Sequence, residues 1–446
     1  MKVIVIGGVA AGMSAASKLK RNLRDDVEIV VYEKGGVVSY GACGLPFFVS
    51  DRIKQADELI ARRPEEFAKS GIDVRIYHQV TTVNFDKKQL TIVNQKTGEI
   101  IKDTYDKLII GSGASVKKIP PFDIELENLY QIRDIEDASK FKEALKQSKN
   151  RRVVVVGAGF IGLEIVDACC KYQKEVILIE AADRILNSMD REITDLLAQE
   201  LDKQHICVKT NTRVSRLVKQ GQMISAVEIE TAQGIETIQA DLVVNCVGIV
   251  PNTDFLTGIE KAENGALIVN ERMETSVLDV YAAGDCSIMK SSVSGVLSYA
   301  PLGTNANKQG RIIGDILGGK QPKPFKLINS VALRLFSLDA AKTGLSEQEA
   351  KQLGIPYRTN LITGNSYASY YGTEQVTIKV IYHAQSRKIL GAQAVGQGIV
   401  VPRVNYYAVA VYTGLTVDEF GFLDLCYSPP FSGVWDAALI ASNTAK

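Results

Sequence analysis

Residues 153–162 read Val-Val-Val-Val-Gly-Ala-Gly-Phe-Ile-Gly, a run of valines followed by three glycines. The valines are typical of a buried strand in a parallel sheet. Gly157, Gly159 and Gly162 have the full G-x-G-x-x-G spacing, which leads into a helix whose free N–H groups can bind a pyrophosphate. Glu180 closes the next expected strand, eighteen residues after Gly162, where a carboxylate can bind a ribose hydroxyl. These residues predict a dinucleotide-binding unit.

Glu180 also bears on the choice of nucleotide. A carboxylate at this place accepts a hydrogen bond from a free 2′-hydroxyl and repels a 2′-phosphate. We therefore expect NADH and disfavour NADPH. Arg184, four residues further on, is a cation that leaves NADPH open.

The N-terminus carries a second turn of this kind. The apolar run 3–6 leads into Gly7-Gly8-Val9-Ala10-Ala11-Gly12, with Val9 where the usual pattern has a glycine. Glu33 ends the next expected strand, twenty-one residues after Gly12, the distance expected for a carboxylate that binds a ribose. With this acid, the turn matches a dinucleotide-binding unit despite Val9. Two such units predict two dinucleotides and hydride transfer between them.

Between the two turns, residues 39–47 read Ser-Tyr-Gly-Ala-Cys-Gly-Leu-Pro-Phe. A helix is expected from about Gly44, because Pro46 suits a first helical turn. Cys43 would then feel the positive end of that helix and be partly thiolate at neutral pH. A buried cysteine in a glycine-rich turn is the ordinary alternative. The flanking turns favour a reactive thiol beside a redox cofactor.

The composition excludes several other classes of function. Fifty-two basic and fifty-one acidic residues leave a net charge of +1, which gives no reason to expect a nucleic acid partner. Seven cysteines without a C-x2-C pair and three scattered histidines argue against a metal site and against a secreted disulfide scaffold. No apolar run reaches the ~18 residues of a membrane span. We expect a soluble, cytoplasmic protein with no membrane partner.

The predicted fold class is α/β, with two Rossmann-like dinucleotide-binding domains and a C-terminal α+β domain. Gly318-Gly319 and two nearby prolines mark the last boundary. Beyond it, expected strands at 375–382 and 389–395 precede a helix, with no nucleotide signature. Dimerisation is the function expected for this part.

With these motifs together, residues 1–446 resemble the flavin-dependent pyridine nucleotide–disulfide oxidoreductases, and within them the single-cysteine coenzyme A-disulfide reductases. The resemblance implies FAD on the first unit and NADH on the second. It also implies an FAD-binding domain at 1–115 and 245–320, an NAD-binding domain at 116–244 and a dimerisation domain at 321–446.

The resemblance assigns roles to individual residues. Glu33 would hold the adenosine part of FAD, and Asp285 of an Ala-Gly-Asp motif the ribityl chain. Phe160 would be an aromatic gate over the flavin, with Glu164 near the nicotinamide. The full expected cofactor-binding set is Gly7, Gly8, Gly12, Glu33, Ser39, Gly111, Gly157, Gly159, Phe160, Gly162, Glu164, Glu180, Gly248, Gly284 and Asp285.

Absent residues narrow the choice within the family. Relatives with two redox cysteines have a C-x4-C pair, but Phe48 occupies the second position here. Single-cysteine NADH oxidases and peroxidases carry a histidine in the first turn, where this chain has Ala10. Only Cys43 can exchange, so the partner sulfur must come from outside.

Tyrosines take the place of the missing histidine. Coenzyme A-disulfide reductases have a Tyr-Tyr pair and a Tyr-x-Pro-Pro motif, matched here by Tyr370-Tyr371 and by Tyr427 with its prolines 429 and 430. By resemblance, Tyr370 and Tyr427 reach the active site of the other subunit of a homodimer and protonate the departing thiolate. Ordinary packing is the alternative, because the chain has seventeen tyrosines.

The implied reaction uses coenzyme A both as substrate and as mixed-disulfide partner of Cys43. NADH reduces FAD, the mixed disulfide is cleaved, and the Cys43 thiolate attacks coenzyme A disulfide. Expected substrate contacts are Ser39, Lys18, Arg21 and Arg62, although solvated surface charge is the ordinary role of such cations. The rivals are an NADH oxidase or peroxidase, a persulfide or polysulfide reductase, and a flavoprotein redox sensor.

Overall fold

Short runs of β-branched residues form the strands of a first parallel sheet, in the order β19-β7-β1-β2-β3. β1 lies in the middle and pairs with β2 and β7, so its valines and isoleucines are buried on both faces. β19 comes from far along the chain and joins the edge beside β7. The bounds are β1 Lys2–Ile6, β2 Glu28–Tyr32, β3 Asp73–Arg75, β7 Lys107–Ile110 and β19 Val280–Ala282.

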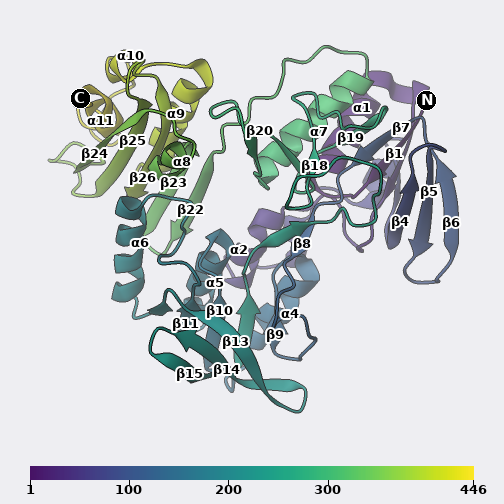
Figure 1. Ribbon diagram of the computed structural model, residues 1–446, viewed down its shortest axis with the longest axis horizontal. Coiled ribbons are helices and arrows are strands. Elements are labelled where there is room, and N and C mark those ends of the chain that lie inside the picture. The colour runs from purple at the N-terminus through teal and green to yellow at the C-terminus, as the bar shows by residue number, and fades with distance from the viewer.

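Two helices that are far apart in the sequence, α1 (Ala10–Leu23) and α7 (Gly303–Leu317), pack against each other beside the sheet (Figure 1). Gly310 allows the close approach, because a Cβ there would lie 2.2 Å from the Ala11 carbonyl oxygen. The other elements of the lobe are α3 Pro64–Ala68, β4 His78–Asn84, β5 Gln89–Asn94, β6 Ile100–Thr104, β18 Leu267–Ile268, β20 Ser287–Lys290 and β21 Leu297–Ser298.

A second parallel sheet has the order β12-β11-β10-β16-β9 and forms the lower lobe of Figure 1, with the antiparallel strands β13, β14 and β15 beside it. Its strands are β9 Leu129–Tyr130, β10 Arg152–Val156, β11 Glu175–Ile179, β12 Cys207–Lys209 and β16 Leu242–Asn245. The remaining elements are α4 Ile135–Lys146, α5 Phe160–Lys171, α6 Arg191–Lys203, β13 Arg213–Gln220, β14 Met223–Thr231 and β15 Gly234–Gln239. The pair β8 Ala114–Val116 and β17 Ile249–Pro251 lies where the chain passes between the two lobes.

The C-terminal lobe is an antiparallel sheet in the order β22-β23-β26-β25-β24, with α9 and α11 packed against it. Its strands are β22 Val331–Leu335, β23 Leu338–Gly344, β24 Tyr357–Asn365, β25 Gln375–His383 and β26 Ile389–Gly396. Its helices are α8 Glu347–Gln352, α9 Val401–Thr413, α10 Val417–Gly421 and α11 Ala437–Asn443.

The short helix α2 (Leu45–Val49) lies within the sequence of the first lobe, between β2 and β3, but packs into the core of the second lobe. Leu45, Phe48 and Val49 belong to the same apolar cluster as Phe141 and Leu163 of α4 and α5. The helix that follows Cys43 is thereby fixed between the two parallel-sheet lobes.

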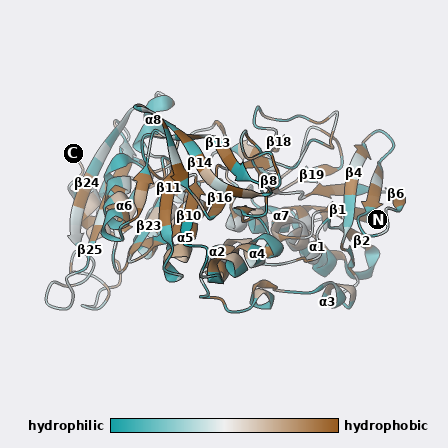
Figure 2. Cartoon of the chain, turned by 90° about the horizontal axis from the view of Figure 1, so that it is seen from below, coloured by the Kyte–Doolittle hydropathy of each residue, from teal (hydrophilic) through white to brown (hydrophobic).

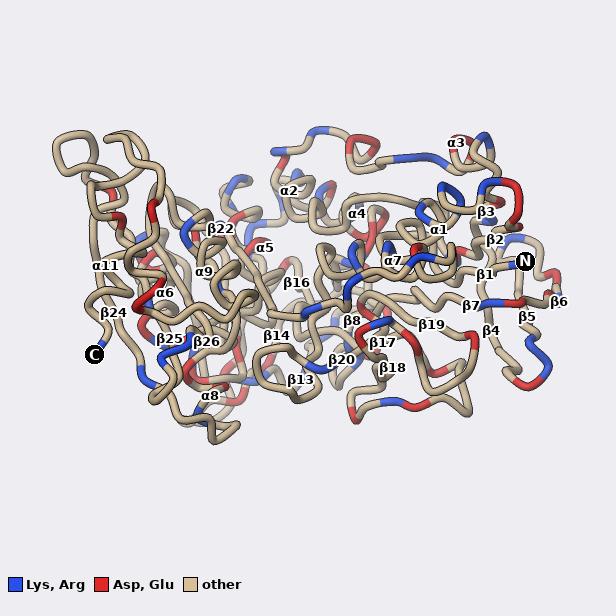
Figure 3. The backbone as a smooth tube through the Cα atoms, turned by 90° about the horizontal axis from the view of Figure 1, so that it is seen from above, with Lys and Arg blue, Asp and Glu red and all other residues tan.

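The computed structural model describes residues 1–446 and confirms the predicted fold class, two parallel-sheet units and a C-terminal α+β unit. The central strands are the most apolar parts of the chain (Figure 2). Acidic and basic residues are both spread along the backbone of all three lobes, in keeping with the net charge of +1 (Figure 3). None of the helices has the length and apolar character needed to cross a membrane.

Candidate active site

The first glycine turn is closed by the chain itself. A Cβ on Gly12 would lie 1.9 Å from the Gly7 carbonyl oxygen, so the turn and α1 can meet only through glycine. The Glu33 carboxylate accepts hydrogen bonds from the N–H groups of Gly8 and Gly35, each at 2.7 Å. Gly111 borders the turn, and Ser39 donates its N–H to the Gly8 carbonyl at 2.8 Å.

The second turn repeats this geometry. A Cβ on Gly162 would lie 1.9 Å from the Gly157 carbonyl oxygen. The Glu180 carboxylate accepts from the N–H groups of Ala158 at 2.7 Å and Ala182 at 2.8 Å. Gly159 has open space where a Cβ would stand, next to the first turn of α5.

Both turns fit a dinucleotide. Each offers a glycine bend, a helix start with free N–H groups and an acid held at the end of the second strand. FAD would be held by the turn at Gly7–Gly12 with Glu33, and a pyridine nucleotide by the turn at Gly157–Gly162 with Glu180.

Arg184, the cation that left NADPH open, is already engaged. Its guanidinium donates to the Gln348 side chain at 2.6 Å and to the carbonyl oxygens of Asn187 and Met189 at 3.3 and 3.4 Å. Of these partners, Gln348 belongs to the C-terminal lobe and the two carbonyls to the second lobe, so Arg184 bridges the two lobes, which weakens the case for a 2′-phosphate contact.

Asp285, expected at the ribityl chain, lies at the end of β19 after Gly284. Its Oδ2 pairs with the Arg133 guanidinium at 2.8 Å, and Arg133 also donates to the Ala114 carbonyl at 2.6 Å. The sequence analysis missed Arg133, because 152 positions separate it from Asp285 and no motif surrounds it. The pair joins the second lobe to the first beside the place expected for the cofactor. Gly248 lies on the same crossing, where its carbonyl accepts the Lys117 N–H at 2.9 Å.

Cys43 is exposed and lies in a 3-10 turn, Ala42–Gly44, immediately before α2. The expectation of a lowered pKa was wrong. Although the residue is exposed, protein atoms around its sulfur desolvate the thiolate and raise the pKa of the Cys43 thiol. The carboxylates of Glu164 and Asp285 raise this pKa further, and a hydrogen bond from the Gly303 backbone opposes them. The helix after Cys43 has only five residues, so its dipole is too small to dominate.

The longer helix that meets Cys43 is α7. It begins at Gly303, where a Cβ would lie 3.5 Å from the Cys43 sulfur. The thiol therefore lies at the start of a helix from a distant part of the chain, which no local pattern around residue 43 reveals.

Glu164 faces the same space from the first turns of α5. It has no hydrogen-bonding partner, and burial followed by the charge of Asp167 raises the pKa of Glu164 to about 7. Asp167, one turn further along, pairs with Arg52 at 3.0 Å. A carboxyl group that titrates near neutrality thus lies close enough to Cys43 for its charge to raise the pKa of the thiol. Phe160, expected as an aromatic gate, opens α5 and is partly buried.

Phe48, which replaces a second redox cysteine, is buried and covered by a cation. The Lys142 ammonium lies 4.1 Å from the centre of the Phe48 ring and 2.9 Å from an Asp51 carboxylate oxygen. Tyr172 donates its hydroxyl to the Val49 carbonyl at 3.0 Å. These contacts from α4 and α5 hold the C-terminal end of α2 against the second lobe.

Tyr370 and Tyr427 are brought together from 57 positions apart, with their hydroxyl oxygens 3.3 Å from each other. They are 77% and 46% exposed, on the C-terminal lobe. The hydrogen bond to Tyr370 raises the pKa of Tyr427, so this hydroxyl stays protonated at neutral pH. Neither tyrosine is bonded to Cys43 of the same chain, and α2 is far from α9–α11 in Figure 1.

The expected substrate-binding cations differ in whether their side chains already have partners within the chain. Arg21 is exposed at the end of α1, but Lys18 pairs with Asp315 of α7 at 3.2 Å. Arg62 stacks on the Phe67 ring, 4.0 Å from its centre, and donates to the Glu66 carbonyl at 3.0 Å. The contacts of Lys18 and Arg62 are those of residues that support the fold.

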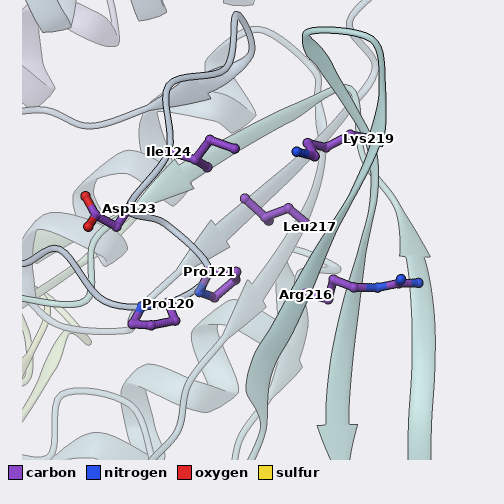
Figure 4. Close-up of a pocket in the computed structure, with 7 residues that line it drawn as sticks. All are labelled: Pro120, Pro121, Asp123, Ile124, Arg216, Leu217 and Lys219. Carbon is purple, nitrogen blue, oxygen red and sulfur yellow. The ribbon is translucent and has the colours of Figure 1, made fainter.

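No group of histidine, cysteine, aspartate and glutamate side chains is arranged to hold a metal ion, and all seven cysteines are free. A cleft of about 360 Å³ lies between residues 120–124 and β13, with Asp123 on one side and Arg216 and Lys219 on the other (Figure 4). It contains none of the expected site residues.

Comparison with known proteins agrees with this geometry. Residues 1–310 match the family model described as pyridine nucleotide-disulphide oxidoreductase, and residues 332–439 match the dimerisation domain of the same family. The second match supports a homodimer.

Full-length relatives carry different names. An NADH oxidase of Enterococcus faecalis is 33% identical over all of this chain and 99% of its own length. An NAD(P)H sulfur oxidoreductase (CoA-dependent) of Pyrococcus furiosus is 34% identical over 100% of this chain and 99% of its own. A coenzyme A disulfide reductase of Staphylococcus aureus is 29% identical over the whole of both chains.

Among solved structures, reduced CoADR-RHD of Bacillus anthracis superposes with a TM-score of 0.94 at 32% identity, over 99% of this chain and 79% of that one. The family matches cover the glycine turns, the acid-ended strands and the C-terminal lobe described above. The chain therefore belongs to the pyridine nucleotide-disulphide oxidoreductase family, as a flavoprotein enzyme that uses a pyridine nucleotide.

Proposed function

We propose that this enzyme uses NADH to reduce coenzyme A disulfide to two coenzyme A thiols, through a mixed disulfide on Cys43. The observation that carries the proposal is the isolation of Cys43 between the two nucleotide turns. Phe48 fills the position of a second redox cysteine and is covered by Lys142. A lone thiol in this place needs its disulfide partner from a substrate.

The residues would act as follows. The Cys43 thiolate attacks one sulfur of coenzyme A disulfide, forms a mixed disulfide and releases one coenzyme A thiolate. Tyr370 and Tyr427 of the other subunit donate a hydrogen bond and then a proton to the leaving sulfur. FAD, when bound, would supply the two electrons of NADH that cleave the mixed disulfide, which returns the Cys43 thiolate and a second coenzyme A thiol.

The domain limits are part of the proposal. We place FAD on residues 1–115 and 245–320, NADH on 116–244, and the subunit contact on 321–446. The bonds of Arg184 to Asn187 and Gln348 favour NADH, because they engage this cation away from a 2′-phosphate. Seven free cysteines favour the cytoplasm, where thiols stay reduced.

The relatives support disulfide or sulfur chemistry but do not choose the acceptor. The names of the P. furiosus and S. aureus proteins both contain coenzyme A, whereas the E. faecalis relative is called an NADH oxidase. Ala10 in the first turn speaks against an oxidase, because it provides no histidine beside an oxidised Cys43.

The test is Cys43→Ser. The variant should keep FAD and reduction by NADH while losing disulfide turnover. Intact mass of the native enzyme should show a coenzyme A adduct on Cys43 that a reductant removes. Undiminished reduction of coenzyme A disulfide by Cys43→Ser would refute the proposal.

A further inference from the structure

The two tyrosines stand on separate loops that depend on one buried side chain. The first tyrosine loop is residues 366–374, between β24 and β25, and carries Tyr370. The second tyrosine loop is residues 422–436, between α10 and α11, and carries Tyr427. Arg403 of α9 lies beneath both loops with 0% of its surface exposed.

Arg403 has donors for both loops at once. Toward the first loop, its Nη2 donates to the Ser366 carbonyl at 2.7 Å and its Nη1 to the Ser366 hydroxyl at 3.4 Å. Toward the second loop, its Nη2 pairs with Asp436 at 2.9 Å and lies 3.5 Å from the Phe431 carbonyl. Nη1 also donates to the Ile399 carbonyl.

The bonds to Arg403 lie close to the tyrosines along the chain. Ser366 is the first residue of its loop and bonds back to Glu374, which closes that loop at 2.7 Å. Phe431 lies four residues after Tyr427, and the loops also touch where the Ala368 N–H donates to the Pro429 carbonyl at 3.3 Å. Only a planar group with five donors reaches all of these acceptors, which is a property of arginine and not of lysine.

We propose that Arg403 is a positioning residue that sets the Tyr370–Tyr427 hydroxyl pair by tying the two tyrosine loops to α9. The inference rests on the proposed function, in which this pair donates to the leaving thiolate. Arg403 has no part in binding either nucleotide, because all its partners belong to the C-terminal lobe.

A single tryptophan provides a fluorescent reporter for the position of the second tyrosine loop. Trp435 is the only tryptophan, it is 53% exposed, and it precedes Asp436, a direct partner of Arg403. It packs edge-on against Phe422 at the start of the same loop, with ring centres 6.2 Å apart. Loss of the tie should loosen Trp435 without unfolding the lobe.

The test uses the FAD-loaded dimer of Arg403→Lys, which keeps a cation for Asp436 but cannot reach both loops. We expect turnover of coenzyme A disulfide to fall by about tenfold to hundredfold, the size of effect that a displacement of about 1 Å can have. Reduction by NADH in a single turnover should stay within about twofold, and acrylamide quenching of Trp435 should increase.

A second background distinguishes this inference from the proposed function. In the Tyr370→Phe/Tyr427→Phe background, the added Arg403→Lys change should lower turnover by less than about twofold, because both hydroxyls that Arg403 positions are gone. Arg387→Lys is the matched control, since Arg387 pairs with Asp418 at 2.6 and 2.8 Å in the same lobe. This control should keep both the turnover and the quenching of the parent.

The outcomes distinguish a failure of the proposed function from a failure of this inference. If Tyr370→Phe/Tyr427→Phe turns over at the parent rate, the tyrosine part of the proposed function fails, and this inference fails with it. If Tyr370→Phe/Tyr427→Phe is slow but Arg403→Lys turns over at the parent rate, or if the losses of turnover from the two changes multiply, only the inference fails. If Arg403→Lys does not fold, the double variant Arg403→Met/Asp436→Asn replaces it. This variant removes both buried charges, and the asparagine still caps α11. The same outcomes decide the inference.

Discussion

Glu164→Gln should stabilise the protein at about pH 8 and leave it nearly unchanged at about pH 4. Burial raises the pKa of Glu164 to about 7 from an ordinary value of 4.5, and the charge of Asp167 adds to this. Between pH 4.5 and about pH 7, the folded chain therefore keeps a proton on Glu164 that the unfolded chain has already released. Stability falls as the pH rises through this window, and the loss is complete above pH ~7.

The magnitude follows from the shift. A difference of about 2.5 pKa units corresponds to a ceiling of about 3.4 kcal/mol. Glu164 is partly exposed, so solvent screening reduces the expected gain to about 1–2 kcal/mol. Glutamine keeps the shape of the side chain and removes the charge at every pH.

Urea unfolding of the FAD-loaded dimer at the two pH values measures this gain. Glu125→Gln is the control, because Glu125 is exposed and has no bonded partner. A second readout is the alkylation of Cys43 after a reductant has removed its coenzyme A adduct, which should be faster in Glu164→Gln at about pH 8, since the Glu164 carboxylate holds the thiol pKa up. If the unfolding free energy of Glu164→Gln differs from that of the parent by the same amount at both pH values, burial does not destabilise the Glu164 carboxylate. That result would refute the reasoning.

Three further outcomes are expected. Glu180 should give a kcat/KM preference for NADH over NADPH of at least about tenfold, or ~1.4 kcal/mol, and Arg184→Ala should leave it unchanged; equal use of both nucleotides would contradict this. Mixing inactive Cys43→Ser subunits with inactive Tyr370→Phe/Tyr427→Phe subunits should restore one good site per heterodimer, and no recovery after verified subunit exchange would mean that the tyrosines act in their own subunit or do not act at all. Lys142→Met should lower the unfolding free energy by about 1–3 kcal/mol, because two carbonyls and a carboxylate lose their cation, and an unchanged urea midpoint would count against this.

The sequence was sufficient for the glycine turns and their acids, because both depend on local spacing. Glu33 and Glu180 accept two backbone N–H groups each, and the strands that they follow have the predicted places. The fold class and the family followed from the same motifs.

Contacts between distant segments could not be predicted. Arg133, Lys142 and Arg403 each bind at least one partner that lies 28 or more positions away in the chain, and no motif surrounds them. The pKa of Cys43 was misjudged for the same reason. Burial, Glu164 and the start of α7 are brought to the thiol only by folding, whereas the local sequence shows a short helix alone.

The central claim is that coenzyme A disulfide is the acceptor of electrons from NADH through Cys43. Oxidation of NADH should be followed without oxygen, with coenzyme A disulfide, polysulfide or no acceptor, and then with oxygen alone. The account predicts that coenzyme A disulfide gives the highest kcat/KM, with two thiols formed for each NADH and with loss of this activity in Cys43→Ser. Oxidation supported by oxygen or polysulfide but not by coenzyme A disulfide would contradict it.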